Sequence, residues 1–507
     1  MRVAVVGAGV GGLAAAADLA RRGCEVTVFE AAEGPGGKMR QIHVAGRGVD
    51  AGPTVFTMRW IFEGLFADAG RRLEDHLEVV PSEILARHAW RAGGRLDLFA
   101  DIDRSAEAIA AFASAEDARN YRAFCARSAA IYRTLAGPFI ASERPSPLAL
   151  VRRVGLGNLG RLWGTAPMAT LWSALGAQFR DARLRQLFAR YATYVGASPF
   201  LAPATLMLIA HVEQDGVWQL RGGMHALARA LHALAEGQGA RFRFAAPVAE
   251  ILVENGRAAG VRLATGEMHR AEAVVFNGDA SALGQGLLGP GARRAAPETP
   301  RARRSLSALT WCLNAPTEGF PLAHHNVFFA EDYAEEFDAI FRRRTLCAAP
   351  TVYVCAQDRG PAAKPPPPGG AERLLVLVNA PADGDAQALD LARHEAEAFA
   401  LLAACGLHVA RAPGRMVATT PEGFHALFPG TGGALYGRAN HGMMGSFARL
   451  GAASRLPGLY LAGGSVHPGA GVPMAAMSGR LAAARLLEDR AGRRRPVLGL
   501  GLRPAPA

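Results

Sequence analysis

Apolar positions follow two different periods along the first thirty residues. Residues 2–6 form an apolar run that ends in glycines, residues 13–22 repeat small and apolar side chains at helical spacing, and residues 24–30 form a second apolar run. These patterns predict a strand, a tight turn, a helix and a second strand. That order is typical of the unit from which α/β folds are built.

The glycines of the predicted turn each have a mechanical role. Gly7 permits the tight turn, Gly9 lets the backbone approach a pyrophosphate, and Gly12 lets the helix pack close to the strand. The start of the helix offers unpaired N–H groups and a partial positive charge to that pyrophosphate. Glu30 closes the second strand, where its carboxylate can bind an adenosine ribose and would repel the 2′-phosphate of NADP. The segment therefore predicts a dinucleotide site.

A secretory signal peptide is the alternative interpretation of this apolar N-terminus. Glycines at 7, 9, 11 and 12 interrupt the apolar run, and no convincing cleavage context follows it. The dinucleotide interpretation is therefore favoured.

The pattern further along the chain predicts elements of both kinds. Helices are expected at 59–75, 103–140, 224–237 and 475–487. Strands are expected within 76–102, on both sides of a hairpin at 254–256, at 273–276 and within 290–435. A chain of 507 residues is too long for one simple core, so we expect two or three domains.

Composition and charge narrow the range of functions. The six cysteines form no C-x-x-C pair, so neither a zinc site nor a disulfide framework is indicated, and a reducing cytoplasmic setting is the default. His324 and His325 are adjacent, but no acid or histidine stands at ligand spacing from them, so no metal is expected. The net charge of +12 permits attraction to an anionic membrane surface. No nucleic-acid-binding module is recognisable.

Residues 148–179 have a pattern typical of a basic amphipathic helix that lies in a membrane interface. Arg152, Arg153 and Arg161 stand among apolar residues, and Trp163 and Trp172 follow them. No run of 18 apolar residues is free of charges and glycines, so a membrane-spanning helix is not expected. The alternative is an ordinary helix whose apolar stripe faces the core.

Two segments that follow the first unit resemble a known family. Residues 33–40 read Glu-Gly-Pro-Gly-Gly-Lys-Met-Arg, and residues 50–54 read Asp-Ala-Gly-Pro-Thr. With the turn at 7–12 they are similar to the carotenoid desaturases related to bacterial phytoene desaturase, within the flavoprotein superfamily that includes amine oxidases. An arginine usually follows the glycine pair in that superfamily, whereas this chain has a lysine, which keeps the charge but loses the planar fork. The resemblance implies cofactor-binding roles for Gly37, Lys38, Arg40, Gly52, Pro53 and Thr54.

The most specific match lies near the C-terminus. Residues 458–474 read Gly-Leu-Tyr-Leu-Ala-Gly-Gly-Ser-Val-His-Pro-Gly-Ala-Gly-Val-Pro-Met. In the family this segment wraps the flavin, and the residue that matches Val248 meets the adenine through its backbone. The resemblance covers residues 1–490 and implies FAD as the cofactor. The contacts that it assigns in the last signature are Gly463, Gly464, Gly471, Val472, Pro473 and Met474.

Two internal segments resemble one subgroup of the family. Residues 190–196 read Arg-Tyr-Ala-Thr-Tyr-Val-Gly and residues 216–219 read Gly-Val-Trp-Gln, which is similar to the 1-hydroxycarotenoid 3,4-desaturases, also called methoxyneurosporene dehydrogenases. The resemblance implies desaturation of an acyclic 1-hydroxycarotenoid at C3–C4, with Tyr191, Tyr194 and Gln219 as candidate substrate contacts. The alternatives are a phytoene-type desaturase or carotenoid isomerase, and a prenyl-binding protein without catalysis.

The expected fold is α/β, with a Rossmann-like FAD-binding domain built from discontinuous segments, as in amine-oxidase-like flavoproteins. A substrate domain with a mixed or antiparallel sheet and a helical region are expected as insertions. Expected partners are a lipophilic carotenoid and the cytoplasmic surface of a membrane, but no nucleic acid. The predicted boundaries are 1–75, 220–285 and 436–490 for the FAD-binding domain, 76–140 and 286–435 for the substrate domain, 141–219 for the helical region and 491–507 for a tail.

Overall fold

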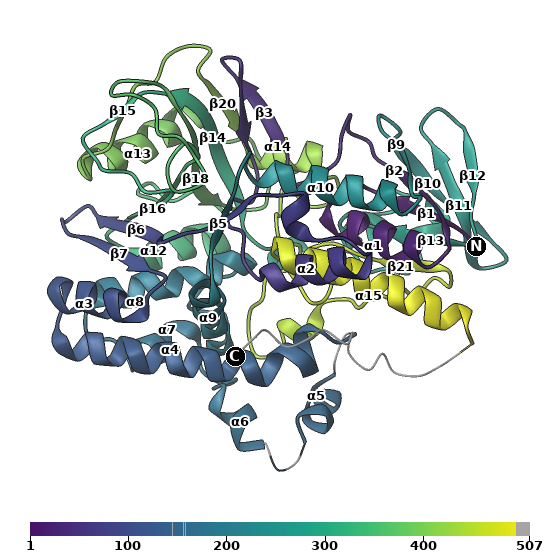
Figure 1. Ribbon diagram of the computed structural model, residues 1–507, viewed down its shortest axis with the longest axis horizontal. Helices are drawn as coiled ribbons and strands as arrows, with labels where there is room; N and C mark the ends of the chain where they lie inside the picture. Colours follow the sequence, from purple (N-terminus) through teal and green to yellow (C-terminus); the bar gives the residue numbers. More distant parts are fainter. Residues whose placement is uncertain (144–145, 156, 158, 493–507) are drawn as a thin grey trace.

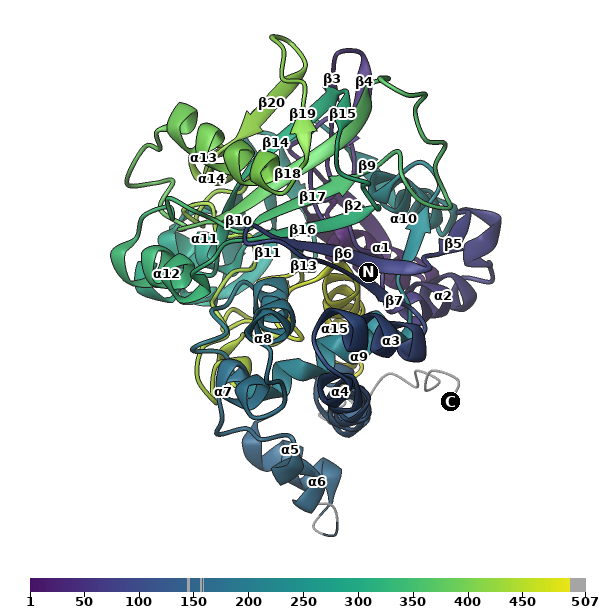
Figure 2. The same ribbon diagram turned by 90° about the vertical axis from the view of Figure 1, so that its left-hand side faces the viewer.

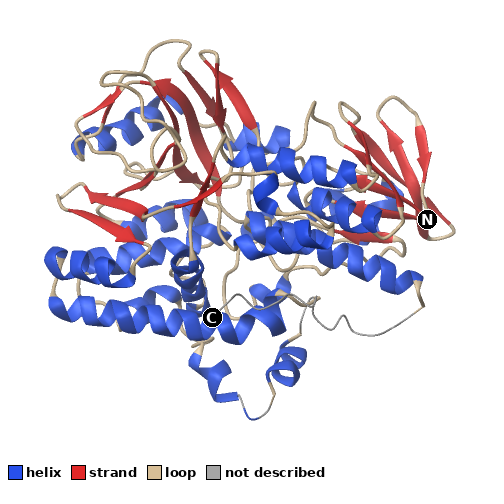
Figure 3. Cartoon of the chain, in the orientation of Figure 1, coloured by secondary structure: helices blue, strands red, loops and turns tan. Residues whose placement is uncertain are grey.

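The computed structural model describes residues 1–143, 146–155, 157 and 159–492, with the side chains at 159 and 161 left out (Figure 1). The part of the predicted tail from residue 493 onward lies outside the described residues. Helices gather below and between two separate groups of strands (Figure 3).

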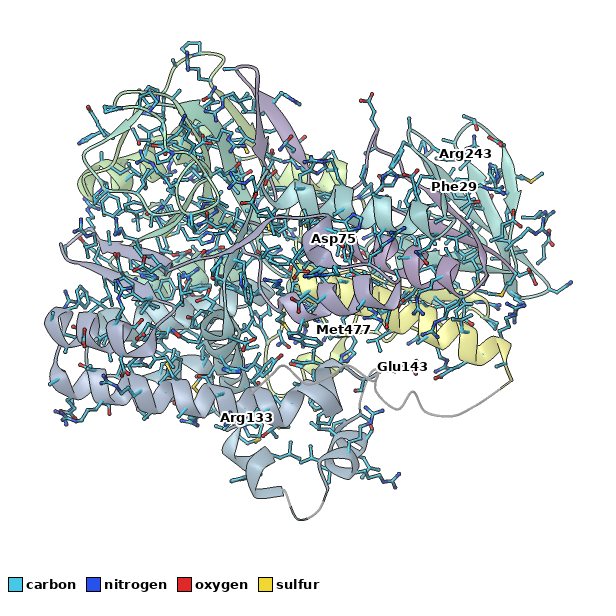
Figure 4. The ribbon with its side chains drawn as sticks, viewed as in Figure 1. Phe29, Asp75, Arg133, Glu143, Arg243 and Met477 are labelled. Carbon is cyan, nitrogen blue, oxygen red and sulfur yellow. The ribbon has the colours of Figure 1, made fainter. Side chains whose placement is uncertain are left out.

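Five parallel strands form the first sheet, in the order β21-β13-β1-β2-β9. Its strands come from three distant parts of the chain, as the discontinuous domain predicted. Phe29 at the end of β2 pairs with Arg243 of β9, and Figure 4 shows both at this outer edge of the sheet. The bounds are β1 Arg2–Val6, β2 Glu25–Phe29, β9 Arg241–Arg243, β13 Ala273–Phe276 and β21 Leu459–Leu461.

Different elements pack against the two faces of this sheet. Helices bury one face in a core shared with Val3, Val5, Val26 and Val28. A three-stranded antiparallel sheet and α11 bury the other face, against Ala4 and Phe29 among others. The helices are α1 Val10–Arg21, α2 Arg59–Asp68, α10 Met224–Gly237 and α15 Val472–Arg490; the second cover is β10 Val248–Glu254, β11 Arg257–Leu263, β12 Met268–Arg270 and α11 Ala280–Gln285.

Seven strands form the second sheet, in the order β20-β14-β18-β17-β16-β6-β7. All neighbours are antiparallel except β16 and β6, which run parallel, so the sheet is mixed. Helix α13 packs on one face through an apolar core around Trp311 and Phe399. The bounds are β6 Ile84–Trp90, β7 Arg95–Phe99, β14 Ser307–Ala315, β16 His325–Phe329, β17 Val352–Ala356, β18 Glu372–Ala380, β20 Met416–Thr419 and α13 Leu391–Ala404.

Short two-stranded sheets connect the larger parts. Strand β5 pairs with β8, which lies just before α10 in the sequence. The two form a sheet of their own, so β5 is not part of the seven-stranded sheet. The pairs β3–β4 and β15–β19 lie beside the second sheet. Their bounds are β3 Gln41–Val44, β4 Arg47–Asp50, β5 Val79–Pro81, β8 Trp218–Leu220, β15 Thr317–Glu318 and β19 His408–Val409; the helices α12 and α14 span Tyr333–Asp338 and Pro421–Leu427.

A helical layer lies below the second sheet and shares one apolar core with it. Two of its helices, α5 and α6, project away from the rest of the molecule (Figure 2). The layer consists of α3 Ile102–Phe112, α4 Ala115–Leu135, α5 Pro147–Val154, α6 Leu159–Gly164, α7 Leu171–Gly176, α8 Ala182–Ala189 and α9 Leu208–Asp215. The predicted domain boundaries stay a prediction. In the structure α3 and α4, which were assigned to the substrate domain, pack among the helices of this layer.

Candidate functional site

A cavity of about 990 Å³ runs between the first sheet, the second sheet and the helical layer. Glycine-rich segments line one part of it, and apolar side chains of the helical layer line another. A cavity of this size, mostly apolar and with few polar groups, is typical of a ligand site. The sequence-predicted cofactor residues on its wall are Gly7, Gly9, Glu30, Gly37, Lys38, Gly52, Pro53, Thr54, Val248, Gly463, Gly464, Gly471, Val472, Pro473 and Met474.

The first glycine turn meets the last glycine segment at the start of α1. A Cβ on Gly11 would lie 2.8 Å from the amide nitrogen of Gly463, so the two segments are in direct contact. Gly7 has a φ of +98°, a conformation that side-chain-bearing residues rarely adopt. A Cβ on Gly12 would lie 2.1 Å from the carbonyl oxygen of Gly7, so Gly12 is needed for close packing and does not line the cavity.

Glu30 stands at the carboxyl end of β2 with its carboxylate held by backbone amides. One oxygen accepts from the N–H of Ala8 at 2.6 Å, and the other accepts from the N–H of Ala32 at 2.9 Å. Each carboxylate oxygen can accept a second hydrogen bond. The group is therefore fixed in place and able to receive two hydroxyl donors from a ribose.

Lys38 brings a buried positive charge to the cavity. Its Nζ donates to the carbonyl oxygen of Leu435 at 2.7 Å. Burial lowers the pKa of Lys38, and the nearby Asp279 opposes that change. The lysine can therefore supply a cation to an acidic ligand group.

Arg40, to which the resemblance assigned a cofactor-binding role, points away from the cavity. Its Nη2 donates to Thr419 Oγ1 at 2.9 Å, and its guanidinium lies 5.7 Å from the ring centre of Phe424. It is not part of the cavity wall. The chain turns toward β3 after Lys38, so the side chain of Arg40 lies beside β20 of the second sheet.

Three polar residues of the wall were missed by the sequence analysis. Asn277 and Asp279 follow β13, and Arg449 lies in a loop before β21. Burial raises the pKa of Asp279 and lowers the pKa of Arg449 to about 10. Ligands of open α/β sheets bind at the carboxyl ends of the strands, so the position of Asn277 and Asp279 just after β13 was a usable signal. No comparable signal in the sequence pointed to Arg449.

The site residues fit a flavin dinucleotide. The Oδ2 atom of Asp279 is buried without a hydrogen-bond partner among the described residues, although its Oδ1 accepts from the N–H of Ser281. Such an atom is costly unless a ligand meets it. Gly9 and Gly37 face each other, and a Cβ on Gly37 would lie 3.2 Å from the Cα of Gly9. A side chain at position 37 would fill the space beside Gly9, whereas one at position 9 would meet Asn277.

The three predicted substrate residues have different positions. Tyr194 lines the cavity, whereas Tyr191 is buried behind it. Both hydroxyls donate to Glu213 of α9, that of Tyr191 at 2.7 Å. Gln219 lies in a second, smaller pocket beside β8, where its side-chain oxygen accepts from the N–H of Ala362. Only Tyr194 of the three faces the large cavity.

The adjacent histidines meet a cysteine that their spacing does not reveal. Pairing of β16 with β17 places Cys355 opposite His325, and possible ligand atoms of both and of His324 lie within 4.8 Å of one another. Burial raises the pKa of the Cys355 thiol, which favours the neutral thiol. Its Sγ lies 3.5 Å from His324 Nε2, so the contact is a thiol–imidazole hydrogen bond.

Sequence comparison agrees with this geometry. The profile of the family described as flavin containing amine oxidoreductase matches residues 10–487. The chain belongs to this family and is a flavin oxidoreductase.

Named relatives make the likeness more specific. The chain is 56% identical to hydroxyneurosporene desaturase of Rubrivivax gelatinosus, over 99% of this chain and 96% of the relative. It is 47% identical to the enzyme of the same name from Cereibacter sphaeroides, over 97% and 99%. A zeta-carotene-forming phytoene desaturase of Myxococcus xanthus is 33% identical, over 96% and 94%. The predicted resemblance to carotenoid desaturases is thereby confirmed.

Solved structures confirm the predicted amine-oxidase-like fold. A variant of putrescine oxidase aligns with a TM-score of 0.60 at 16% identity, over 96% of this chain and 99% of that one. An oxidoreductase from Methanosarcina mazei aligns with a TM-score of 0.59 at 18% identity, over 96% and 100%. At this identity the likeness concerns the fold.

Proposed function

We propose that the protein is an FAD-dependent desaturase that introduces the C3–C4 double bond of acyclic 1-hydroxycarotenoids. The observation that carries the proposal is that one continuous cavity has a glycine-lined part that suits a dinucleotide and an apolar part that suits a polyene. The relatives named hydroxyneurosporene desaturase support the substrate class. The intact cofactor signatures argue against a prenyl-binding protein, which would be colourless when purified.

FAD would be held by residues from both ends of the chain. The first turn of α1 and Lys38 would meet the pyrophosphate, and Glu30 the ribose. The segment at 463–474 would lie along the flavin, with Val248 at the adenine. When bound, FAD supplies an acceptor for a hydride, which carries two electrons.

The chain itself orients the polyene and excludes water from it. The C4 hydrogen of the substrate is allylic to the conjugated chain, so its loss as hydride leaves a delocalised cation on the polyene. Transfer of a proton from C3 to a weak base then completes the new double bond, because the electron pair of that C–H bond becomes the C3–C4 π bond. Apolar wall residues keep water from the cation, among them Leu206, Leu208, Ile209, Val212 and Val327.

Substrate choice tests the proposal directly. A pocket that buries the C1 hydroxyl must offer it a hydrogen-bond partner, and that partner would be stranded by a hydrocarbon end. Hydroxylated neurosporene or lycopene should therefore be desaturated much faster than phytoene when both compete in one membrane preparation. Chromatography of the products measures the ratio. Comparable conversion of phytoene would move the assignment to a phytoene-type desaturase, and geometric isomers without new double bonds would move it to an isomerase.

We also propose that α5 and α6 dock on the membrane from which the substrate enters. Their exposed side chains include Leu148 and Trp163, which are 61% and 75% exposed, with Arg152 and Arg153 exposed beside them; Met168, four residues after α6, is 71% exposed. The less exposed residues Leu150, Val151 and Leu162 line the cavity. The placement supports the peripheral interpretation for the first half of 148–179. In the second half Trp172 packs against Arg185 and Phe200, as an ordinary core residue.

Liposome flotation should depend on both lipid charge and salt. Replacing Arg152 and Arg153 by glutamine should weaken binding to anionic vesicles about 30-fold, since each cation near the surface contributes about 1 kcal/mol. Trp163→Ala should weaken binding to neutral and anionic vesicles alike, because it removes an apolar anchor. Among the helices that the structure describes, none is long and apolar enough to cross a bilayer.

Met268→Ala serves as the matched control for this prediction. Met268 is 59% exposed in β12, on the sheet at the other end of the molecule. Its loss should leave flotation unchanged. Flotation that ignores lipid charge and salt would refute the electrostatic part of the proposal.

A further inference from the structure

Arg190 is a buried cation on the wall of the cavity. It follows α8 directly and is 9% exposed. Within the described residues no carboxylate forms an ion pair with its guanidinium; Nη1 donates to the hydroxyl of Tyr194 at 3.2 Å, and Nε has no hydrogen-bond partner. A buried charge is costly unless it is met by hydrogen-bond acceptors. The cavity is the side from which an acceptor can come.

Tyr194 and Glu213 hold this guanidinium in a fixed position. The Tyr194 hydroxyl accepts from Arg190 and donates to Glu213, whose other oxygen accepts from Tyr191 at 2.7 Å. Burial alone would lower the pKa of Arg190, but the nearby tyrosines and Glu213 raise it overall, so the residue stays charged. The wall therefore presents a permanent donor.

The donor lines the same cavity as the segment expected to hold the cofactor. Tyr353 also lines this cavity, and its hydroxyl is 2.7 Å from Thr54 Oγ1. Thr54 belongs to the stretch 52–54 on the cofactor part of the wall. Apolar side chains of α9, Leu208, Ile209 and Val212, line the same cavity. An oxygen bound by Arg190 would thus lie in a cavity that has both an apolar wall and the cofactor segment.

We propose that Arg190, positioned by Tyr194 and Glu213, is the specificity-determining residue that binds the C1 hydroxyl oxygen of the substrate. The inference rests on the proposed function and names the group that recognises its substrate. Donation from the guanidinium to the hydroxyl oxygen would compensate the buried charge. An unhydroxylated end would leave the guanidinium with the Tyr194 hydroxyl but without an acceptor in the cavity, so it is rejected. The C1 hydroxyl lies close to the C3–C4 bond, which agrees with a donor on the wall of the cavity that also has the cofactor segment.

The test compares a hydroxylated and an unhydroxylated substrate of equal conjugation, 1-hydroxyneurosporene and neurosporene, with the purified FAD-loaded protein. Arg190→Gln should lower the ratio of their kcat/KM values about 10- to 100-fold, the range for a lost hydrogen bond to a charged group. The loss should fall on the hydroxylated substrate alone. Tyr194→Phe keeps the volume and should lower the same ratio by a smaller factor, because the guanidinium loses its positioning partner.

Arg185→Gln is the matched control. Arg185 lies on α8, five residues before Arg190, with its guanidinium 3.9 Å from the ring centre of Trp172 and away from the cavity wall. Its replacement should leave the ratio unchanged. Equal losses for both substrates in Arg190→Gln, or an unchanged ratio, would overturn the inference. Loss of the flavin absorbance in Arg190→Gln would assign the guanidinium to the cofactor and overturn it too. If the wild type itself shows no preference, the proposed function fails instead.

Discussion

Replacing Gly9 by valine is expected to give a folded protein that carries no flavin. Gly9 is the N-cap of α1, and a Cβ there would lie 2.8 Å from Asn277 Nδ2. Asn277 cannot move freely, since the same Nδ2 donates to the carbonyl oxygen of Gly7 at 3.3 Å. The valine side chain would therefore displace Asn277 from its bond to Gly7 and distort the turn where the pyrophosphate must approach the backbone. The absorbance spectrum of the purified variant measures the loss.

Gly34→Val separates this effect from a general intolerance of the loop. Gly34 lies in the same part of the chain, has an ordinary φ, and a Cβ on it would meet no atom within 4 Å. This variant should keep its yellow colour. If Gly9→Val retained flavin absorbance at the wild-type ratio to protein, Gly9 would not lie at the pyrophosphate.

Local patterns were enough to predict the elements that bear the cofactor cavity. Strand β1, helix α1 and strand β2 agree with the predicted order, and α10 has the predicted bounds 224–237. The hairpin at 254–256 is also confirmed, because Asn255 and Gly256 both have positive φ and Glu254 pairs with Arg257. Each of these features depends on neighbours within a few positions in the sequence.

Features that depend on the direction of a side chain were not predictable. Lys38 and Arg40 are two residues apart, yet Lys38 lies on the cavity wall whereas Arg40 donates to Thr419 of β20. Arg190 and Tyr191 were equally visible in one motif, but Arg190 lines the cavity whereas Tyr191 donates to Glu213 of α9. Such outcomes depend on which distant element packs beside each residue.

Replacing Arg480 by methionine is expected to lower the free energy of unfolding by about 3–5 kcal/mol. Arg480 lies in α15 with a side chain that is 2% exposed, and its Nε donates to Asp18 of α1 at 3.1 Å. It also pairs with Asp68 at the end of α2, so one guanidinium joins three helices. Methionine would fill the space but leave the Asp18 carboxylate, which is 3% exposed, with a weaker set of partners. Denaturant unfolding followed by helical circular dichroism measures the change.

A double-mutant cycle tests whether the buried Asp18 carboxylate, once it has lost Arg480, causes the loss of stability. Asp18→Asn in the Arg480→Met background removes the buried charge and should restore a large part of the lost stability. Arg21→Met is the matched control. Arg21 also bonds Asp18, at 3.0 Å, but its side chain is 24% exposed, so its replacement should cost less than about 1 kcal/mol.

A second reason to expect a large effect of Arg480→Met is the close contact of α1 and α15: a Cβ on Gly479 would lie 2.0 Å from the carbonyl oxygen of Gly11. A shift of α15 would therefore displace the first turn of α1. Arg480→Met should for this reason also weaken flavin retention, whereas Arg21→Met should not. Equal stability of the Arg480→Met and Arg21→Met variants would show that Asp18 does not need its buried partner.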